Sequence, residues 1–180
     1  MLAPICPDTL LSQLSSSPSV RVFLGLGSNL KNPREQLQKG LASIQQTLPI
    51  EAFAVSSFVE TPPLAGMQQP NYLNCVCRFS TALEPLQLLL RLRAIEDAHG
   101  RTREVHWGAR TLDIDILLYG SLKCCDAQLS LPHPSLEQRE FVLVPLLELN
   151  PDLLNLNGQS YATILQNYYL TQPSQLKKAP

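Results

Sequence analysis

The stretch RTLDIDILLYG, residues 110–120, has the clearest strand pattern of the chain. Four apolar residues alternate along it: Leu112, Ile114, Ile116 and Leu118. On a strand, residues i and i+2 point to the same face, so Asp113 and Asp115 share a face within a strongly apolar segment. Two unpaired carboxylates there would repel each other and lose solvation, which raises the question of what they hold.

The composition is that of an ordinary globular protein with one domain. The chain has 180 residues, of which 44% are hydrophobic and 16% are charged. Its net charge of −1 argues against a broad nucleic-acid surface, and no apolar run reaches the roughly 18 residues of a membrane span. The N-terminus lacks the pattern of a secretory signal, and the five cysteines fit no common zinc spacing. We therefore expect reduced thiols and a cytoplasmic location.

Hydrophobic periodicity predicts strands alternating with helices. We expect strands over residues 20–26, 51–59, 72–80 and 111–119, and short ones around 121–126 and 141–144. One helix is predicted from Asn32 as N-cap to Pro49, and a second from Thr81-x-x-Glu84 to Gly100. Shorter helices are predicted over 146–149 and 161–168.

The order of these elements, βαββαβ with later additions, indicates the fold class. It predicts an α+β, ferredoxin-like α-β sandwich with a mainly antiparallel sheet and helices on its faces. Residues 1–19 are expected to form a flexible N-terminal arm, 20–170 the domain, and 171–180 a frayed C-terminal tail.

The carboxylate pair suits a hard cation. Mg²⁺ prefers carboxylate, water and phosphate oxygens. The i, i+2 spacing sets the two Cα atoms about 6.5–7 Å apart, from which both carboxylates can reach a pair of ions about 3.5–4 Å apart. A solvated face of an edge strand remains the alternative, because Asp-x-Asp alone does not decide between them.

Cationic residues stand just before the pair, at Arg101, Arg103 and Arg110. Arginine forks match phosphate oxygens, and polyphosphate transfer needs such charges, although a solvated basic loop is the alternative. Trp107, the only tryptophan, covers either a ligand or a core. His133 stands between two prolines and either donates to a nucleotide or is structural. The chain has no P-loop, and Gly25-x-Gly27 lacks the third glycine of a Rossmann fingerprint.

Five segments together resemble the family of 6-hydroxymethyl-7,8-dihydropterin pyrophosphokinases (HPPK). They are GLGSNL (25–30), SSFVETPPL (56–64), QPNYLNCV (69–76), IEDAHGRTREVHWGARTLDIDILLYG (95–120) and LPHPSLEQREFVLVPLLEL (131–149). The resemblance implies transfer of pyrophosphate from ATP to the pterin hydroxymethyl group in folate biosynthesis, with AMP as the leaving product. It implies no nucleic-acid or membrane partner, and leaves open an association with neighbouring folate-pathway enzymes.

The resemblance also implies a role for individual residues. Two Mg²⁺ ions would be held by Asp113 and Asp115. Catalytic roles would belong to Arg101, Arg103, Arg110 and Asp115. The pterin site would comprise Thr61, Pro62, Leu64, Tyr72, Asn74, Trp107 and Phe141, with the ring between Tyr72 and Phe141. The ATP site would comprise Glu96, Arg103, Arg110, Ile116, Ser130, His133 and Arg139.

Three other functions are alternatives to this one. The first is a catalytically weak or inactive pterin- or nucleotide-binding protein on the same fold. It is favoured by His106 and Ala109, which stand where many relatives carry Arg and Pro. The second is an RNA-binding ferredoxin-like domain, which the net charge disfavours. The third is a nucleotide-sugar glycosyltransferase with an Asp-x-Asp motif, for which 180 residues leave little room.

Overall fold

The computed structural model describes residues 18–63, 68–100 and 110–179. Its main sheet contains β1 (Val20–Ser28), β2 (Ile50–Val55), β3 (Val59–Thr61), β4 (Tyr72–Thr81), β5 (Asp113–Tyr119) and β8 (Lys177–Lys178). A separate hairpin contains β6 (Cys124–Cys125) and β7 (Ser130–Leu131). The helices are α1 (Pro33–Thr47), α2 (Pro85–Ala98), α3 (Glu140–Leu149) and α4 (Tyr161–Thr171), with a 3₁₀ turn, η3, at Leu136–Gln138.

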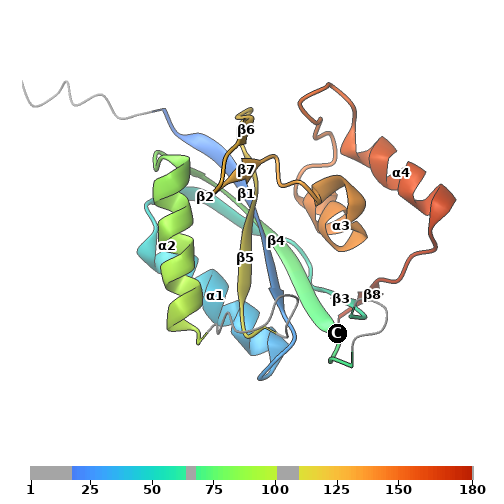
Figure 1. The fold of residues 1–180 in the computed structure, drawn as a ribbon, viewed down its shortest axis with the longest axis horizontal. Helices are drawn as coiled ribbons and strands as arrows, with labels where there is room; N and C mark the ends of the chain where they lie inside the picture. The colour runs from blue at the N-terminus through green and yellow to red at the C-terminus, as the bar shows by residue number, and fades with distance from the viewer. Residues whose placement is uncertain (1–17, 64–67, 101–109, 180) are drawn as a thin grey trace, which may run out of the picture.

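The predicted α+β, ferredoxin-like fold is confirmed. The strand order is β5-β1-β4-β3-β8, β2 also pairs with β4, and every pairing is antiparallel. Figure 1 shows α1 and α2 on one side of this sheet and α3 and α4 on the other. We call these sides the first face and the second face.

The first face carries the larger core. The α1 stripe predicted from periodicity is buried at Leu37, Leu41, Ile44 and Leu48. It packs with α2 against alternate residues of β1, β4 and β5, among them Leu24, Cys77 and Ile116. The three strands thereby leave their other side chains for the second face.

The predicted alternation of the 110–120 stretch holds only as far as Ile116. Leu117 and Leu118 both belong to the second core, with Phe23 and Val76, while Tyr119 returns to the first. The β1–β5 register shifts between Phe23 and Leu24, so an extra residue enters β5 there. The expectation that Leu118 continues the first face is therefore wrong.

The helix ends lie near the positions predicted from the sequence, but the capping contacts differ from those expected. Asn32 is the residue before α1, but it has φ 59° and its side chain makes no cap hydrogen bond. Helix α2 begins at Pro85 with a capping box between Glu84 and Gln87, so the expected start at Thr81 is wrong. Gly100 ends α2 with φ 73°, as predicted.

Three strand predictions are wrong in whole or in part. The strand expected over residues 51–59 is interrupted, because Ser56 turns to bond Val76 through both its backbone N–H and its hydroxyl. The strand expected over 141–144 is the first half of α3, and the helix expected over 146–149 is its second half. Tertiary packing decides this element, because Val142 and Leu146, four residues apart, are both buried against the second face. Of the strand expected over 121–126, only Cys124–Cys125 forms.

The C-terminal segment differs from the frayed tail that was expected. Lys177 pairs with Glu60 and Lys178 with Val59, which adds β8 to the edge of the sheet beside β3. Among the described residues, no helix has the length and apolar character needed to cross a membrane.

Candidate active site

A row of paired residues crosses three strands on the second face. Asp113 of β5 pairs with Gly27 of β1, which pairs with Asn74 of β4. Paired residues in an antiparallel sheet point to the same side, and neighbouring strands lie about 4.8 Å apart. The side chains of Asp113 and Asn74 therefore flank a position that has no side chain.

The next row on the same face repeats this arrangement. Asp115 pairs with Gly25, and Gly25 pairs with Val76. Gly25 and Gly27 thus leave a surface without side chains beside the two aspartates, here called the glycine floor, rather than forming a nucleotide loop. Space above this floor is limited at Gly27, where an added Cβ would lie 3.0 Å from the Asn74 side-chain oxygen.

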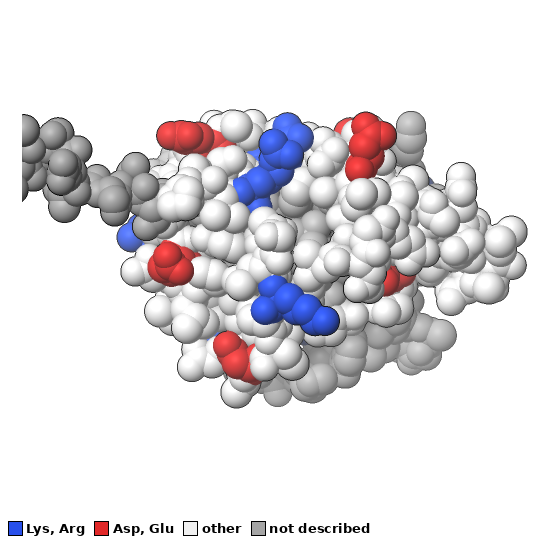
Figure 2. Space-filling view, turned by 90° about the horizontal axis from the view of Figure 1, so that it is seen from above, with Lys and Arg blue, Asp and Glu red and all other residues white. Residues whose placement is uncertain are grey.

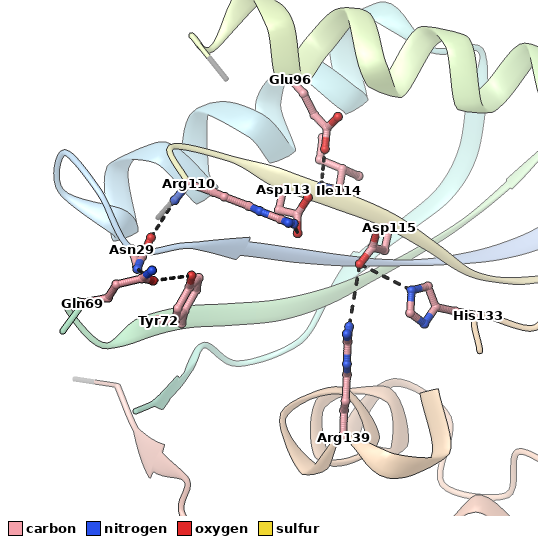
Figure 3. A network of polar contacts seen from close by, with 10 residues as sticks. All are labelled: Asn29, Gln69, Tyr72, Glu96, Arg110, Asp113, Ile114, Asp115, His133 and Arg139. Atoms are coloured by element: carbon pink, nitrogen blue, oxygen red, sulfur yellow. Dashed lines mark hydrogen bonds and ion pairs between the residues drawn. The ribbon is translucent and has the colours of Figure 1, made fainter. Parts of the chain in front are cut away.

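Asp115 stands among charged and titratable neighbours. Its carboxylate oxygen lies 3.7 Å from the His133 ring and 4.0 Å from the Arg139 guanidinium. Figure 3 shows these two side chains converging on Asp115 from the loop after β7 and from the start of α3. Burial first, and the charge of Asp113 second, raise the pKa of Asp115, while the cationic neighbours oppose this rise.

The orientation of His133 is fixed from behind. Its backbone N–H donates to the Leu117 carbonyl, and its Nδ1 accepts from the Ser135 backbone N–H at 3.1 Å. In the neutral ring the proton is therefore on Nε2, the nitrogen that faces Asp115. Burial lowers the pKa of His133, and the negative charge of Asp115 acts against this.

Arg110 and Asn29 connect Asp113 to a second group of side chains. The Arg110 guanidinium forms an ion pair with Asp113. The Asn29 side chain accepts from the Arg110 backbone N–H at 2.8 Å and donates to Gln69 at 3.3 Å, and Gln69 accepts from the Tyr72 hydroxyl at 2.9 Å (Figure 3). A chain of hydrogen bonds thus runs from the carboxylates to Tyr72.

A cleft of 340 Å³ opens beside Asp115. Its lining includes five residues expected around ATP or metal: Glu96, Asp115, Ile116, Ser130 and His133. Glu96 is only 2% exposed and accepts from the backbone N–H of Ile114 at 2.7 Å, so it also fixes the free edge of β5. Arg110 and Arg139 do not line this cleft, but both lie at the aspartates.

Most of the residues expected around the pterin lie beyond the glycine floor. Asn74 and Thr61 are both buried, and the Asn74 amide donates to the Thr61 hydroxyl at 3.1 Å. Tyr72 is half-buried, and Pro62 is exposed just after β3. Phe141 lies at the start of α3, with its ring centroid 5.8 Å from the Arg139 guanidinium carbon. Leu64, Arg101, Arg103 and Trp107 lie outside the described residues.

The donor set fits Mg²⁺ in combination with a substrate. The described residues contain no group of three or more acidic, His or Cys side chains that would hold a metal by themselves. Asp113 and Asp115 supply oxygen ligands alone, and a magnesium ion commonly takes one or two carboxylates and completes its shell with water and phosphate oxygens. The mutual repulsion that raises the pKa of Asp115 would be relieved by a cation between them.

Sequence reasoning missed the positions that have no charge. Gly25 and Gly27 lack the third glycine of a Rossmann pattern and otherwise enter only through the GLGSNL segment, although two glycines at i, i+2 on a strand give a bare face. Asn29 and Gln69 have no such signal, because their partners are distant in sequence and known only from the folded chain.

The charges on the surface give no continuous basic patch on the face seen in Figure 2. The described Lys and Arg side chains there lie apart, and Asp and Glu lie among them. A contiguous basic surface is what sequence-independent binding of nucleic acid requires.

Comparisons with known proteins identify the family of the chain. A protein-family model described as 7,8-dihydro-6-hydroxymethylpterin-pyrophosphokinase (HPPK) matches residues 23–151. A Haemophilus influenzae protein named 2-amino-4-hydroxy-6-hydroxymethyldihydropteridine pyrophosphokinase is 41% identical over 149 residues, which is 83% of this chain and 93% of that protein. A Pseudomonas aeruginosa protein of the same name is 42% identical over 145 residues, 81% of this chain and 90% of that protein.

Solved structures show the same fold in a longer chain. A Plasmodium falciparum HPPK-DHPS structure matches with a TM-score of 0.72 at 13% identity, over 92% of this chain. The present chain spans 50% of the length of that one. With the match of the family model and the identities above, the chain belongs to the 7,8-dihydro-6-hydroxymethylpterin-pyrophosphokinase family.

Proposed function

We propose that this chain transfers pyrophosphate from ATP to 6-hydroxymethyl-7,8-dihydropterin in folate synthesis, using Mg²⁺ at Asp113 and Asp115. The observation that carries the proposal is the row Asp113–Gly27–Asn74. This row has a carboxylate of the kind that Mg²⁺ prefers on one side of a position without a side chain, and on the other side an amide suited to a heterocycle. Membership of the pyrophosphokinase family supplies the reaction.

The reaction needs one oxygen nucleophile and one leaving group. The pterin hydroxyl oxygen attacks the β-phosphorus of ATP, the bond from that phosphorus to the oxygen of the α-phosphate breaks, and AMP leaves. We propose that the hydroxyl proton passes to Asp115, which lies beside the attacked phosphate in this arrangement. Bound Mg²⁺ would neutralise phosphate oxygens and lower the cost of the charge that develops during transfer.

The cations at the carboxylates would hold the polyphosphate. Arg110 and Arg139 reach Asp113 and Asp115, so their guanidinium groups are close to any phosphate that shares a metal with these residues. His133 presents an Nε2 proton to the same place. We propose that Arg101 and Arg103 add to this clamp and that residues 101–109 close over the substrates, with Trp107 against the pterin.

The pterin would lie between Tyr72 and Phe141. Aromatic faces supply contact area for a flat ring, and a few amides supply its identity. Asn74, held by Thr61, supplies the amide, and Pro62 and Leu64 are proposed to complete the pocket. The cleft beside Asp115 is lined by Glu96, Ile116 and Ser130, and we propose that these residues surround ATP.

Partners and location are also part of the proposal. A Schizosaccharomyces pombe protein named folic acid synthesis protein fol1 is 37% identical over 145 residues, which are 20% of its length. Together with the HPPK-DHPS chain, this supports an association of the present chain with other enzymes of folate synthesis. A cytoplasmic location is supported by the free thiols of Cys75, Cys77, Cys124 and Cys125.

Identification of the products tests the proposed reaction. The full chain is incubated with ATP, Mg²⁺ and 6-hydroxymethyl-7,8-dihydropterin, and the products are resolved by ³¹P NMR and chromatography. AMP and pterin diphosphate in equal amounts are expected. ADP would instead show transfer of a single phosphoryl group, and pterin binding without any turnover would show a binding protein.

A further inference from the structure

Glu140 is a buried carboxylate that the proposed chemistry does not use. It is 3% exposed and stands at the first residue of α3, between Arg139 and Phe141. Its neighbours in sequence therefore include the guanidinium that reaches Asp115 and the ring expected against the pterin. Whatever fixes Glu140 also fixes the backbone on either side of it.

The hydrogen bonds of Glu140 come from the C-terminal segment. The Ser174 hydroxyl donates to Oε1, and the Gln175 backbone N–H donates to Oε2 at 3.1 Å. Among the described residues no Lys or Arg forms an ion pair with it. Residues 174–179, here called the C-terminal strap, thus supply a donor to each carboxylate oxygen of this buried group, and the Tyr169 side chain of α4 is a further hydrogen-bond partner.

The strap continues from Glu140 to the outer edge of the sheet. Lys177 pairs with Glu60 of β3, and the Ala179 backbone N–H donates to the Phe58 carbonyl at 3.2 Å. Strand β3 ends at Thr61, whose hydroxyl holds Asn74. Figure 1 shows the chain running from α4 past α3 to β8 beside β3. One segment therefore connects the two sides of the expected pterin pocket.

The start of α3 is held by the burial of Val142 and Leu143, but no side-chain cap fixes its first residues. Arg139, the residue before the helix, has an extended backbone and makes no side-chain cap. A carboxylate in the first turn is favoured by the helix dipole, but the dipole does not select a position for it. The two hydrogen bonds from the strap select a position for the Glu140 carboxylate, because they fix both of its oxygens.

We propose that the C-terminal strap is a positioning element of the active site, which acts through Glu140 on Arg139 and Phe141. The proposal rests on the proposed function, since that function gives Arg139 and Phe141 their substrates. Loss of the Ser174 donor would let the first turn of α3 move and would widen the pocket from behind, although neither Ser174 nor Glu140 touches a substrate.

Single substitutions in the full chain test this proposal. Ser174→Ala removes the hydroxyl donor, Glu140→Gln places an amide N–H₂ against one of the two donors, and the double variant combines both. Thr171→Ala is the matched control, because its hydroxyl bonds only the Tyr168 carbonyl at the exposed end of α4. Dissociation constants for the dihydropterin and for Mg·ATP, together with kcat and KM, are measured well below the melting temperature of each variant.

We expect pterin and ATP binding to weaken about tenfold in Ser174→Ala and in Glu140→Gln, because a hydrogen bond to a charged group is lost. The double variant should be no weaker than the worse single one, since both changes break the same link. The control should bind as wild type. Lower melting temperatures with unchanged dissociation constants in both single variants would overturn the proposal, because the strap would then only stabilise the fold.

The same series separates this proposal from the proposed function. If the wild type releases no AMP, the function fails, whereas the binding constants still report on the strap. If the wild type turns over and the variants bind and turn over as it does, the function stands and the strap proposal fails.

Discussion

At the scale of single residues, the two aspartates influence each other directly. The charge of Asp113 is the second cause, after burial, of the raised pKa of Asp115. In Asp113→Asn this charge is lost, and Arg110 loses its ion pair with Asp113, so both changes favour the ionised form of Asp115. We expect the pKa of Asp115 to fall toward its ordinary value of 3.8 in a ¹³C NMR titration of the metal-free protein.

The matched control for that titration is Asp152→Asn, which removes a carboxylate from an exposed turn. It should leave the pKa of Asp115 as in the wild type. An Asp115 that titrates identically in Asp113→Asn would mean that the carboxylates do not interact and that the site is not a shared cation site.

The glycine floor gives a second prediction at this scale. An alanine at position 27 would place its methyl carbon 3.0 Å from the Asn74 side-chain oxygen, so Asn74 must move. We expect Gly27→Ala to weaken dihydropterin binding about tenfold, the cost of one misplaced hydrogen bond. Stability should change little, since the gain of roughly 0.5–1 kcal/mol from replacing a glycine in a strand interior is opposed by displacement of the buried Asn74–Thr61 hydrogen bond. Fluorescence titration measures the binding.

Gly25→Ala provides the comparison for this variant. Its added methyl lies on the same face but meets the Leu117 side chain at 3.3 Å rather than Asn74. Pterin binding should therefore change less than in Gly27→Ala. Equal losses in the two variants would show that bulk on the floor, and not the position of Asn74, controls binding.

At the scale of elements, a histidine joins the two helices of the first face. The ring of His99, at the end of α2, lies 3.1 Å from the Ser43 hydroxyl of α1. Burial first, and the charge of Lys39 second, lower the pKa of His99 below its ordinary value of 6.5. The unfolded chain therefore binds the proton more readily, and stability should rise with pH up to about 6.5 and then level off.

We expect His99→Gln to reduce this pH dependence. Glutamine keeps a hydrogen-bonding group for Ser43 but does not titrate, so the variant should lose less stability than the wild type as pH falls below 6.5. His133 has a lowered pKa as well and leaves part of the slope in place. Chemical unfolding at several pH values gives the comparison, and equal slopes in the two proteins would refute the assignment to His99.

The elements also show where reasoning from sequence stops. Periodicity found the buried stripe of α1, because Leu37, Leu41 and Ile44 are spaced for one helix face. It failed for α3, where the run FVLVP is apolar throughout and fits either a strand or a helix. Pro145 lies inside that helix, against its usual preference. Packing against the second face decides the element, and the sequence does not display such long-range contacts.

The candidate site divides in the same way. The sequence alone could predict Asp113, Asp115 and Arg110, since charged residues within or next to an apolar strand segment are unusual and can be recognised without the fold. Asn29 and Glu140 could not be predicted, because a single polar residue is ordinary until the fold brings its partners from 40 and 34 positions away. The bulge at Leu117 likewise follows from the pairing of β5 with β1 rather than from either strand.

At the scale of the whole molecule, ATP binding should stabilise the fold only when the metal is present. A ligand at about 100 times its Kd adds about 2.7 kcal/mol, which raises the melting temperature of a protein of this size by roughly 5–10 °C. We expect Mg·ATP to give such a rise and ATP with EDTA to give little, because Asp113 and Asp115 repel phosphate without a cation. Thermal unfolding with and without the chelator measures both. An equal rise under both conditions would contradict a metal-dependent site.

The most direct test of the central claim is the rate of AMP formation at saturating ATP, Mg²⁺ and dihydropterin in Asp113→Asn, Asp115→Asn and the control Asp152→Asn. If the paired carboxylates hold the metal for pyrophosphoryl transfer, the first two variants should lose about a hundredfold or more in rate while still binding the pterin, and the control should match the wild type. Wild-type rates in either Asp113→Asn or Asp115→Asn would contradict the account.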